Sequence, residues 1–333
     1  MPPDQAWIKS QIATEPNGAG CEKGNARQLR VVLPPQFRTQ LPLLQSEANN
    51  PPKRVLMPGG SLMTGRSLPD ARYFQIAALS SLLFINFSLI DFGARPLPSV
   101  IAIGTALLTQ LVCSRLAGLP HLDLRSPLIT GLSLSLLLRA DALWLYAAAA
   151  VIAIGSKFVF RVEGKHIWNP AGLAIVVLLL TSNGVWISPG QWGTEVWFAA
   201  LTGFLAILVL GAARRADIAI FFFGSHAALL LARAWWLGDP LGIPLHQLQS
   251  GSLLIFTFFM ISDPRTTPDS AAGRFLFAFA VALLAHYMAF FMQMRPALYF
   301  ALIILSPATI MIDRLLPAKR FTWADPVPQG ASR

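Results

Sequence analysis

Cysteine and charge are the two scarce features of this sequence. Only Cys21 and Cys113 occur in 333 residues, which is too few for a disulfide framework or a cysteine-ligated cluster. Charged residues make up 13% of the chain, against roughly 25% in an ordinary soluble protein, while hydrophobic residues make up 54%. This balance excludes a soluble globular chain and indicates a polytopic membrane protein that lies in a lipid bilayer.

The sequence also lacks the motifs of common catalytic centres. It has no glycine-rich phosphate loop followed by Lys and Ser or Thr, no G-x-S-x-G, no H-E-x-x-H and no C-x-x-C. We therefore predict no metal site and no autonomous catalytic residue. Any chemistry has to come from a bound cofactor or from transport.

Acidic residues are fewer than basic ones, and the formal net charge is +10. The basic residues stand between apolar runs and in the two tails, without gathering in one cluster. Such residues orient membrane spans, because Lys and Arg favour the cytoplasmic side. We therefore expect no nucleic-acid partner.

The first 71 residues contain no apolar run long enough to cross a membrane and are rich in proline, which predicts a disordered tail. Met57 and Met63 suggest that translation starts nearer the membrane than Met1. The predicted organisation is a cytoplasmic tail over 1–71, a first membrane repeat over 72–190, a second over 191–316 and a cytoplasmic tail over 317–333.

The rest of the chain predicts an all-α fold of about ten transmembrane helices. Lys and Arg gather in alternate connections, which predicts a multi-pass membrane protein with both termini in the cytoplasm. The expected location is a bacterial inner (plasma) membrane. The expected spans are 73–91, 97–114, 126–138, 142–160, 168–182, 195–212, 216–236, 250–262, 273–291 and 296–312.

Two of these spans are too short to cross a bilayer as helices. Residues 251–262 would rise only about 18 Å, against a hydrocarbon core of roughly 30 Å. The third span, 126–138, is similarly short, and L-I-T-G-L-S-L in it loosely matches L-Q-S-G-S-L-L at 248–254. Short segments in matching positions of two halves indicate two inverted five-helix repeats with a central binding site.

Three pairs of a capping residue followed by proline predict helix starts: Ser126-Pro127, Asn169-Pro170 and Thr267-Pro268. A helix N-terminus can also hold an anion. Simple capping and ligand binding both remain open, and Asp269 favours capping at Thr267 because it already supplies negative charge there.

Asp263 is followed by Pro264, which is typical of a type I turn. It also lies where the short eighth span ends, beside Arg265 and a run of hydroxyl side chains. A turn residue and a functional carboxylate are equally supported.

His226 and His286 fall near the middle of the seventh and ninth spans. We expect each to be a neutral histidine hydrogen-bonded between helices, with a proton relay as the alternative. Asn86 and Gln110 are expected to make interhelical hydrogen bonds.

Three motifs resemble one known family. R-S-P-L-I-T-G-L-S-L-S-L-L-L at 125–138, G-K-H-I-W-N-P-A-G-L at 164–173 and F-F-M-I-S-D-P-R-T-T-P at 258–268 are similar to RnfD and NqrB, membrane subunits of ion-pumping electron-transport complexes. The resemblance spans about 72–317. It implies a ten-helix bundle, flavin in the membrane, redox chemistry coupled to movement of sodium or protons, and other membrane subunits as partners.

One departure separates this chain from typical members, which attach FMN to the threonine of an S-G-A-T motif after the fifth span. Here that connection contains no S-G-A-T, and Thr194 has different neighbours, so the chain resembles a divergent branch. Any flavin, FMN or riboflavin, is expected to be non-covalent. The predicted cofactor-binding residues are Arg125, Ser126, Thr130, Gly131, Lys165, Asn169, Asp263, Arg265, Thr266 and Thr267.

Three functions follow from these observations. The first is a flavin-associated membrane subunit of a redox-linked ion-translocating system. The second is a cofactor-free transporter or channel for a small polar solute through the same central cavity. The third is a structural partner subunit with no activity of its own.

Overall fold

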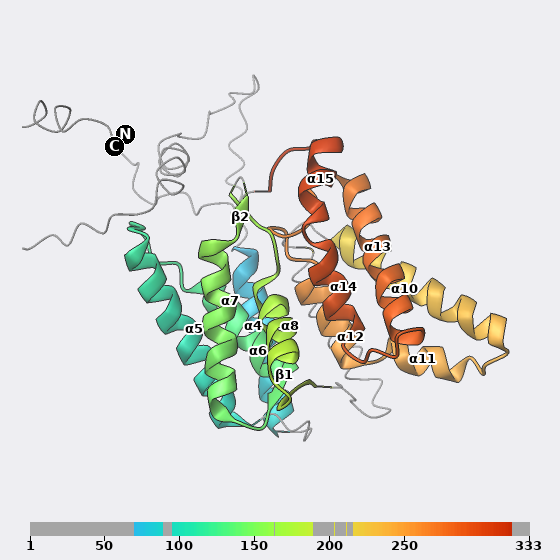
Figure 1. Cartoon of the computed structure of the whole chain (residues 1–333), viewed down its shortest axis with the longest axis horizontal. Coiled ribbons are helices and arrows are strands. Elements are labelled where there is room, and N and C mark those ends of the chain that lie inside the picture. Colours follow the sequence, from blue (N-terminus) through green and yellow to red (C-terminus); the bar gives the residue numbers. More distant parts are fainter. Residues whose placement is uncertain are drawn as a thin grey trace, which may run out of the picture. The chain divides into compact units, whose positions relative to one another are not determined.

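The computed structural model describes residues 70–88, 95–162, 164–188 and 216–321, together with positions 203 and 211. Within this part the chain is mostly helical, as predicted (Figure 1). The helices are α4 (Ala71–Ser88), α5 (Pro96–Leu116), α6 (Arg125–Leu137), α7 (Leu143–Val159), α8 (Pro170–Thr181), α10 (Ala216–Leu237), α11 (Gly242–Leu248), α12 (Gly251–Ile255) with the π-helix η1 (Phe256–Met260), α13 (Ala271–Phe290), α14 (Ala297–Leu305) and α15 (Ala308–Leu315).

Each expected span coincides with one helix or with a consecutive pair, except 195–212, which lies outside the described residues apart from positions 203 and 211. The tails over 1–71 and 317–333 also lie almost wholly outside them, so their prediction stays untested. The expected third span is the 13-residue α6, and the expected eighth span is α12 followed by η1. Both short segments are therefore confirmed as short helices.

Three described helices are long and apolar enough to cross a membrane: α5, α10 and α13. A fourth span is formed if α14 and α15, which meet at a 50° bend, are taken together. The remaining apolar helices α7, α8 and α12 with η1 are shorter. The chain is thus a membrane protein with several spans, while the ten-helix count and the inverted repeat stay predictions.

The expectation of a purely helical chain needs one correction, because the structure contains short strands. β1 (Leu138–Ala140) pairs antiparallel with β4 (Val185–Ile187), and β2 (Arg161–Val162) pairs antiparallel with β3 (Lys165–His166). β1 follows the short helix α6 directly. Backbone that leaves a helix early must find other hydrogen-bond partners, and these ladders supply them.

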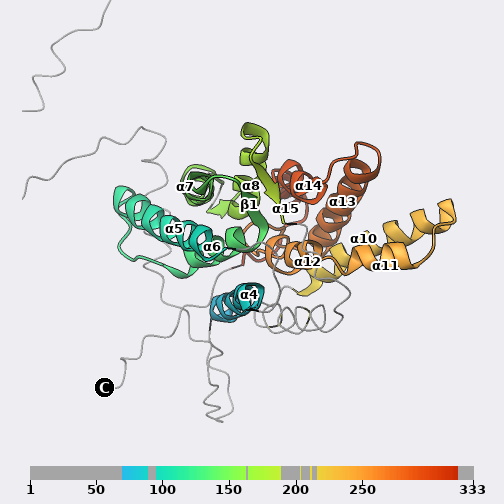
Figure 2. The same ribbon diagram turned by 90° about the horizontal axis from the view of Figure 1, so that it is seen from below.

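The described helices pack in two groups that follow the sequence. In the first, α5 packs on α6 and α7, α4 packs on α6, and α7 packs on α8. In the second, α13 packs on α10 and α14 (Figure 2). The groups meet where α8 contacts α14, and there Trp168 Nε1 donates a hydrogen bond of 2.9 Å to the Ile303 carbonyl.

Small side chains allow the helices of the first group to approach closely. Ala149, Ala150 and Ala153 of α7 are fully buried. On α6, a Cβ added to Gly131 would lie 2.8 Å from the Ile103 Cα of α5, so only glycine fits. Helices in membranes associate through such small residues, since lipid supplies no hydrophobic drive between them.

Candidate functional site

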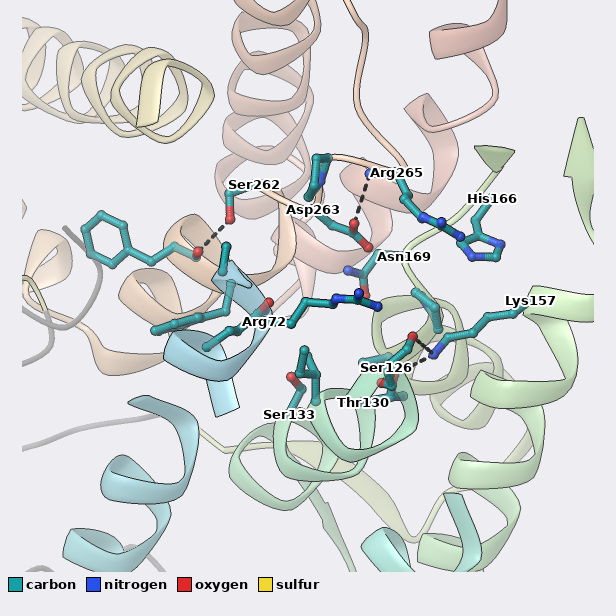
Figure 3. Close-up of a pocket in the computed structure, with 18 of the residues that line it drawn as sticks. Arg72, Ser126, Thr130, Ser133, Lys157, His166, Asn169, Ser262, Asp263 and Arg265 are labelled. Carbon is teal, nitrogen blue, oxygen red and sulfur yellow. Dashed lines mark hydrogen bonds between the residues drawn. The ribbon is translucent and has the colours of Figure 1, made fainter. Parts of the chain in front are cut away.

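The two short helical segments meet at one cavity of about 130 Å³ (Figure 3). α6 contributes residues from its first three turns, and η1 contributes residues from its end and from the turn that follows. The polar lining residues are Arg72, Gln75, Asp123, Ser126, Thr130, Ser133, Lys157, His166, Asn169, Ser262, Asp263 and Arg265.

The π-helix explains how the chain reaches this cavity from α12. Ile261 N donates to the Phe256 carbonyl over 3.0 Å, which is the wider π pattern, and the Thr257 hydroxyl donates to the Leu253 carbonyl over 2.7 Å. Such π turns are rare and occur often at functional sites. The helix ends directly afterwards, and the turn that contains Asp263 begins.

An Asp-x-Arg motif occurs three times around the cavity. In each, the Asp Oδ1 accepts a hydrogen bond of 3.0 Å from the backbone N–H of its own Arg. The three motifs are Asp70-Ala-Arg72 before α4, Asp123-Leu-Arg125 before α6 and Asp263-Pro-Arg265 after η1.

The first two motifs lock together as a four-residue ion network. Arg72 bonds its own Asp70 at 2.6 Å and also pairs with Asp123, while Arg125 bonds its own Asp123 at 2.9 Å and Asp70 at 2.8 Å. Burial tends to raise the pKa of both carboxyls, but hydrogen bonds and charge from the arginines outweigh it and lower each pKa below its usual value. Both carboxylates are therefore ionised, and their charge balances that of the two arginines.

The third motif has no such partner. Arg265 is exposed, and among the described residues no carboxylate lies within ion-pair distance of its guanidinium. Asp263 is partly exposed at the cavity, where desolvation raises its pKa despite the Arg265 N–H bond and the charges of Lys157 and Arg265. Thr266 N donates to the Asp263 carbonyl over 3.2 Å, which confirms the predicted turn.

Lys157, near the end of α7, is the most buried cation of the cavity, with 5% of its surface exposed. Its Nζ donates to the Ser126 hydroxyl at 3.0 Å and to the Thr130 hydroxyl at 2.9 Å (Figure 3). No carboxylate of the described chain lies within ion-pair distance of it. A buried ammonium held only by neutral hydroxyls lacks a counter-charge, which is costly.

His166 and Asn169 complete the wall on the side of β3 and α8. His166 is 7% exposed, and its Nδ1 is buried without a hydrogen-bond partner among the described residues. Burial together with Arg161 and Arg265 lowers its pKa to about 2. This imidazole is neutral at physiological pH. Asn169 caps α8, accepting from Gly172 N at 3.0 Å, and its Nδ2 donates to the Met260 carbonyl at 3.3 Å.

The structure brings five of the ten predicted cofactor-binding residues to this cavity: Ser126, Thr130, Asn169, Asp263 and Arg265. The other five line no part of it. Arg125 lies in the ion network, Gly131 lies against α5, and Thr266 and Thr267 donate their hydroxyls to the Asp263 carbonyl. That any of these ten residues binds a cofactor stays a prediction.

Lys165 lines a second cavity, of about 210 Å³, beside α15. Its Nζ pairs with Asp269 at 2.8 Å and Asp313 at 2.7 Å and donates to the Thr267 carbonyl at 3.1 Å. These contacts tie the β2–β3 hairpin to the second helix group. Lys165 is therefore satisfied by carboxylates, whereas Lys157 is not.

Of the three predicted N-caps only Asn169 is confirmed. α6 begins at Arg125, one residue earlier than expected, and Ser126 accepts from Lys157 instead of capping. α13 is capped by Ser270, which accepts from Gly273 N at 3.0 Å, while Thr267 lies in the preceding turn. The predictions for Ser126 and Thr267 were wrong because Lys157 donates to the Ser126 hydroxyl and the Thr267 hydroxyl donates to the Asp263 carbonyl of its own turn.

The predicted interhelical hydrogen bonds of the mid-span polar residues are not found either. Asn86 Oδ1 and the Nδ1 atoms of His226 and His286 are buried without partners among the described residues. Gln110 donates to Ser114 at 3.1 Å within its own helix α5.

Sequence reasoning overlooked four ionisable residues of the cavity wall: Arg72, Asp123, Lys157 and His166. Two signals were present. The Asp-x-Arg repeat could have linked the three connections, and a lysine inside an apolar run is a functional hypothesis by default.

The fold and site define a multi-pass membrane protein with a charged cavity at the ends of two short helical segments. Residues 181–322 match the model of the NQR2, RnfD, RnfE family. The chain is also 27% identical to an RnfD protein of Stutzerimonas stutzeri, which is named as part of an ion-translocating oxidoreductase complex, in an alignment that covers 63% of this chain and 80% of that protein. Both matches support the RnfD and NqrB family, and the resemblance seen in the motifs is confirmed.

Proposed function

We propose that this chain is a membrane subunit of an ion-translocating oxidoreductase complex in a bacterial inner membrane. The observation that carries the proposal is the match to the family and to the RnfD protein of such a complex. The polar cavity at the ends of α6 and η1 supports it, because transport proteins place binding sites where short helices meet. Other membrane subunits are the expected partners, and sodium or a proton is the expected ion.

We further propose that this chain is flavin-associated, with the polar end of a non-covalent flavin in this cavity. The donor groups suit it, since Lys157, Asn169 and Arg265 all line the cavity. The volume of about 130 Å³ is below the roughly 300–1,000 Å³ of small-molecule pockets. The cavity therefore fits a polar head group and not the isoalloxazine ring. A bound flavin would supply one- and two-electron chemistry.

The test is purification of the affinity-tagged full chain from native membranes in mild detergent. We expect co-purification of further membrane subunits and flavin absorbance between the near ultraviolet and the blue. Extraction with acid should release the flavin, because no covalent bond is expected. A chain that purifies alone, without a chromophore, from membranes in which a related complex stays intact would contradict the proposal.

A cofactor-free transporter of a small polar solute is the second candidate, and one observation favours it. Asp263, Ser126 and Thr130 line the same cavity, and carboxylate and hydroxyl oxygens suit a polar solute or cation. This function predicts uptake by proteoliposomes of the chain alone and its loss in Asp263→Asn. Uptake that needs the other subunits and a flavin would instead assign transport to the redox complex.

A further inference from the structure

We infer that the cavity between α6, α7 and η1 is an anion site that takes a phosphate group, with the Lys157 ammonium as its central counter-charge. The inference deepens the proposed function and rests on it only in placing a ligand at this cavity. Three independent features carry it: the unbalanced charge of the wall, the donors left without partners, and the small volume of the cavity.

The charge of the wall is unbalanced in favour of cations. Arg72 and Asp123 line the cavity, but their charges are neutralised within the ion network. Lys157 and Arg265 remain against the single carboxylate of Asp263. An anion between Lys157 and Arg265 would supply the counter-charge that the described chain does not.

Because Lys157 is buried, its unbalanced charge costs free energy when the cavity holds only solvent. Lys157 is 5% exposed and is fixed by hydroxyls on α6, so it cannot extend to bulk water. A surface lysine needs no explanation, but a buried one without a carboxylate does. The neighbouring Lys165 shows the usual solution, with two carboxylates within 2.8 Å.

Neutral donors at the same cavity suit an oxyanion. His166 is 7% exposed and its buried Nδ1 lacks a partner, so a neutral imidazole can donate a hydrogen bond from this atom. The N-terminal turns of α6 and α8 adjoin the cavity through Ser126 and Pro170, and helix N-termini favour negative charge. These donors surround the site from both sides.

The size of the cavity points to a compact anion. A volume of about 130 Å³ holds several water molecules at roughly 30 Å³ each, which suits a phosphate or a phosphate monoester head. Such a group has several acceptor oxygens, enough to bond Lys157, Arg265 and His166 together. It could belong to free phosphate, to the ribityl phosphate of FMN or to the head of phosphatidic acid.

The experiment measures binding of inorganic phosphate to the purified full chain, by equilibrium dialysis with radiolabelled phosphate in phosphate-free detergent. We expect saturable binding that Lys157→Met weakens by about tenfold or more, since a hydrogen bond between charged groups is lost. Lys157→Arg should retain most of it. Lys319→Met, which removes an exposed lysine that lines neither cavity, is the control and should bind as the wild type does.

Arg265→Gln keeps the test decisive if Lys157→Met does not fold. The side chain is exposed, so the variant should fold, and we expect phosphate binding weakened by about threefold to tenfold. No saturable phosphate binding in the wild type, or wild-type affinity in both Lys157→Met and Arg265→Gln, would overturn the inference.

Competition then identifies the source of the phosphate group. Displacement by FMN but not by riboflavin assigns the group to a flavin, and displacement by nanodiscs of phosphatidic acid but not of phosphatidylcholine assigns it to a lipid. Displacement by neither leaves free phosphate as the ligand, and all three results uphold the anion site. Flavin absorbance is read on the purified complex, and phosphate binding is measured on chain that is free of flavin. A complex that carries flavin, whose flavin-free chain binds no phosphate, overturns this inference alone.

Discussion

Asp70 and Arg125 lie 55 residues apart in the sequence, yet Arg125 Nη1 donates to Asp70 Oδ2 over 2.8 Å. The bond joins the residue that precedes α4 to the first residue of α6. Together with Arg72 and Asp123 it closes a network in which each arginine contacts both carboxylates. The network positions one wall of the candidate site before any ligand binds.

Asp70→Asn should destabilise the protein by about 2 kcal/mol. The Asp70 side chain is 6% exposed, and its removal leaves Arg72 and Arg125 with Asp123 as their one counter-charge in the network, but solvent at Arg125 moderates the cost. The measurement is the thermal unfolding midpoint in detergent. Asp239→Asn breaks a pair about one-third exposed, Arg233–Asp239 at 3.5 Å, and should cost less than about 1 kcal/mol. Equal losses in the two variants would show that the network adds nothing.

The same network makes the stability of the protein depend on pH. The folded-state pKa of Asp70 is lowered, so its stabilisation is complete above the ordinary value of 3.8 and is lost as pH falls through the lower folded value. We expect the stability difference between wild type and Asp70→Asn to stay constant from about pH 7 to about pH 5 and to shrink below about pH 4. Unfolding midpoints across this range test it. A difference that shrinks already between pH 7 and pH 5 would contradict the lowered pKa.

Gly131→Ala should destabilise by about 1–3 kcal/mol, because the new methyl group would lie 2.8 Å from the Ile103 Cα and force α6 away from α5. Gly104→Ala is the matched control on the facing helix, where a Cβ meets nothing within 4 Å. That change should be neutral or should stabilise by up to about 1 kcal/mol. Thermal unfolding of both variants decides, and the prediction fails if Gly131→Ala is tolerated as well as Gly104→Ala.

Two variants of Asn169 should separate its two roles. Asn169→Ala removes both the cap of α8 and the bond to the Met260 carbonyl, and should cost about 2 kcal/mol. Asn169→Asp keeps a capping oxygen but loses the Nδ2 donor, so its cost should be about half as large. Ser270→Ala removes a helix cap alone, so its loss of stability, about 1 kcal/mol, measures what a cap contributes in this protein. Wild-type stability of Asn169→Asp would refute a structural role for the bond to Met260.

Much of the helix pattern was predictable from hydropathy and charge. The expected third span 126–138 appears as α6, and the expected eighth span ends as foreseen before Asp263. Asn169-Pro170 and Asp263-Pro264 also behave as their residue types predict, because capping and turn formation depend on neighbours in the chain. Capping and turn formation of this kind can be predicted from the sequence without a structure.

The candidate site was predictable only in part, because it depends on contacts between distant segments. Ser126 was expected to cap α6, but Lys157, 31 residues further on, takes its hydroxyl. Lys157 lies near the end of α7, and Lys165 lies in the connection between α7 and α8. Their neighbours in the sequence do not indicate that Lys165 pairs with two carboxylates and Lys157 with none.

The sequence by itself determined that the chain lies in a membrane, where most of its helices begin and end, and which two segments are too short to span. These properties follow from hydropathy and from local capping. Only the tertiary structure decided that the Asp-x-Arg motifs converge, that two of them neutralise each other and that the third is left open beside Lys157. The physical reason is that charge balance in a low-dielectric interior depends on distances across the fold, which separation along the chain does not specify.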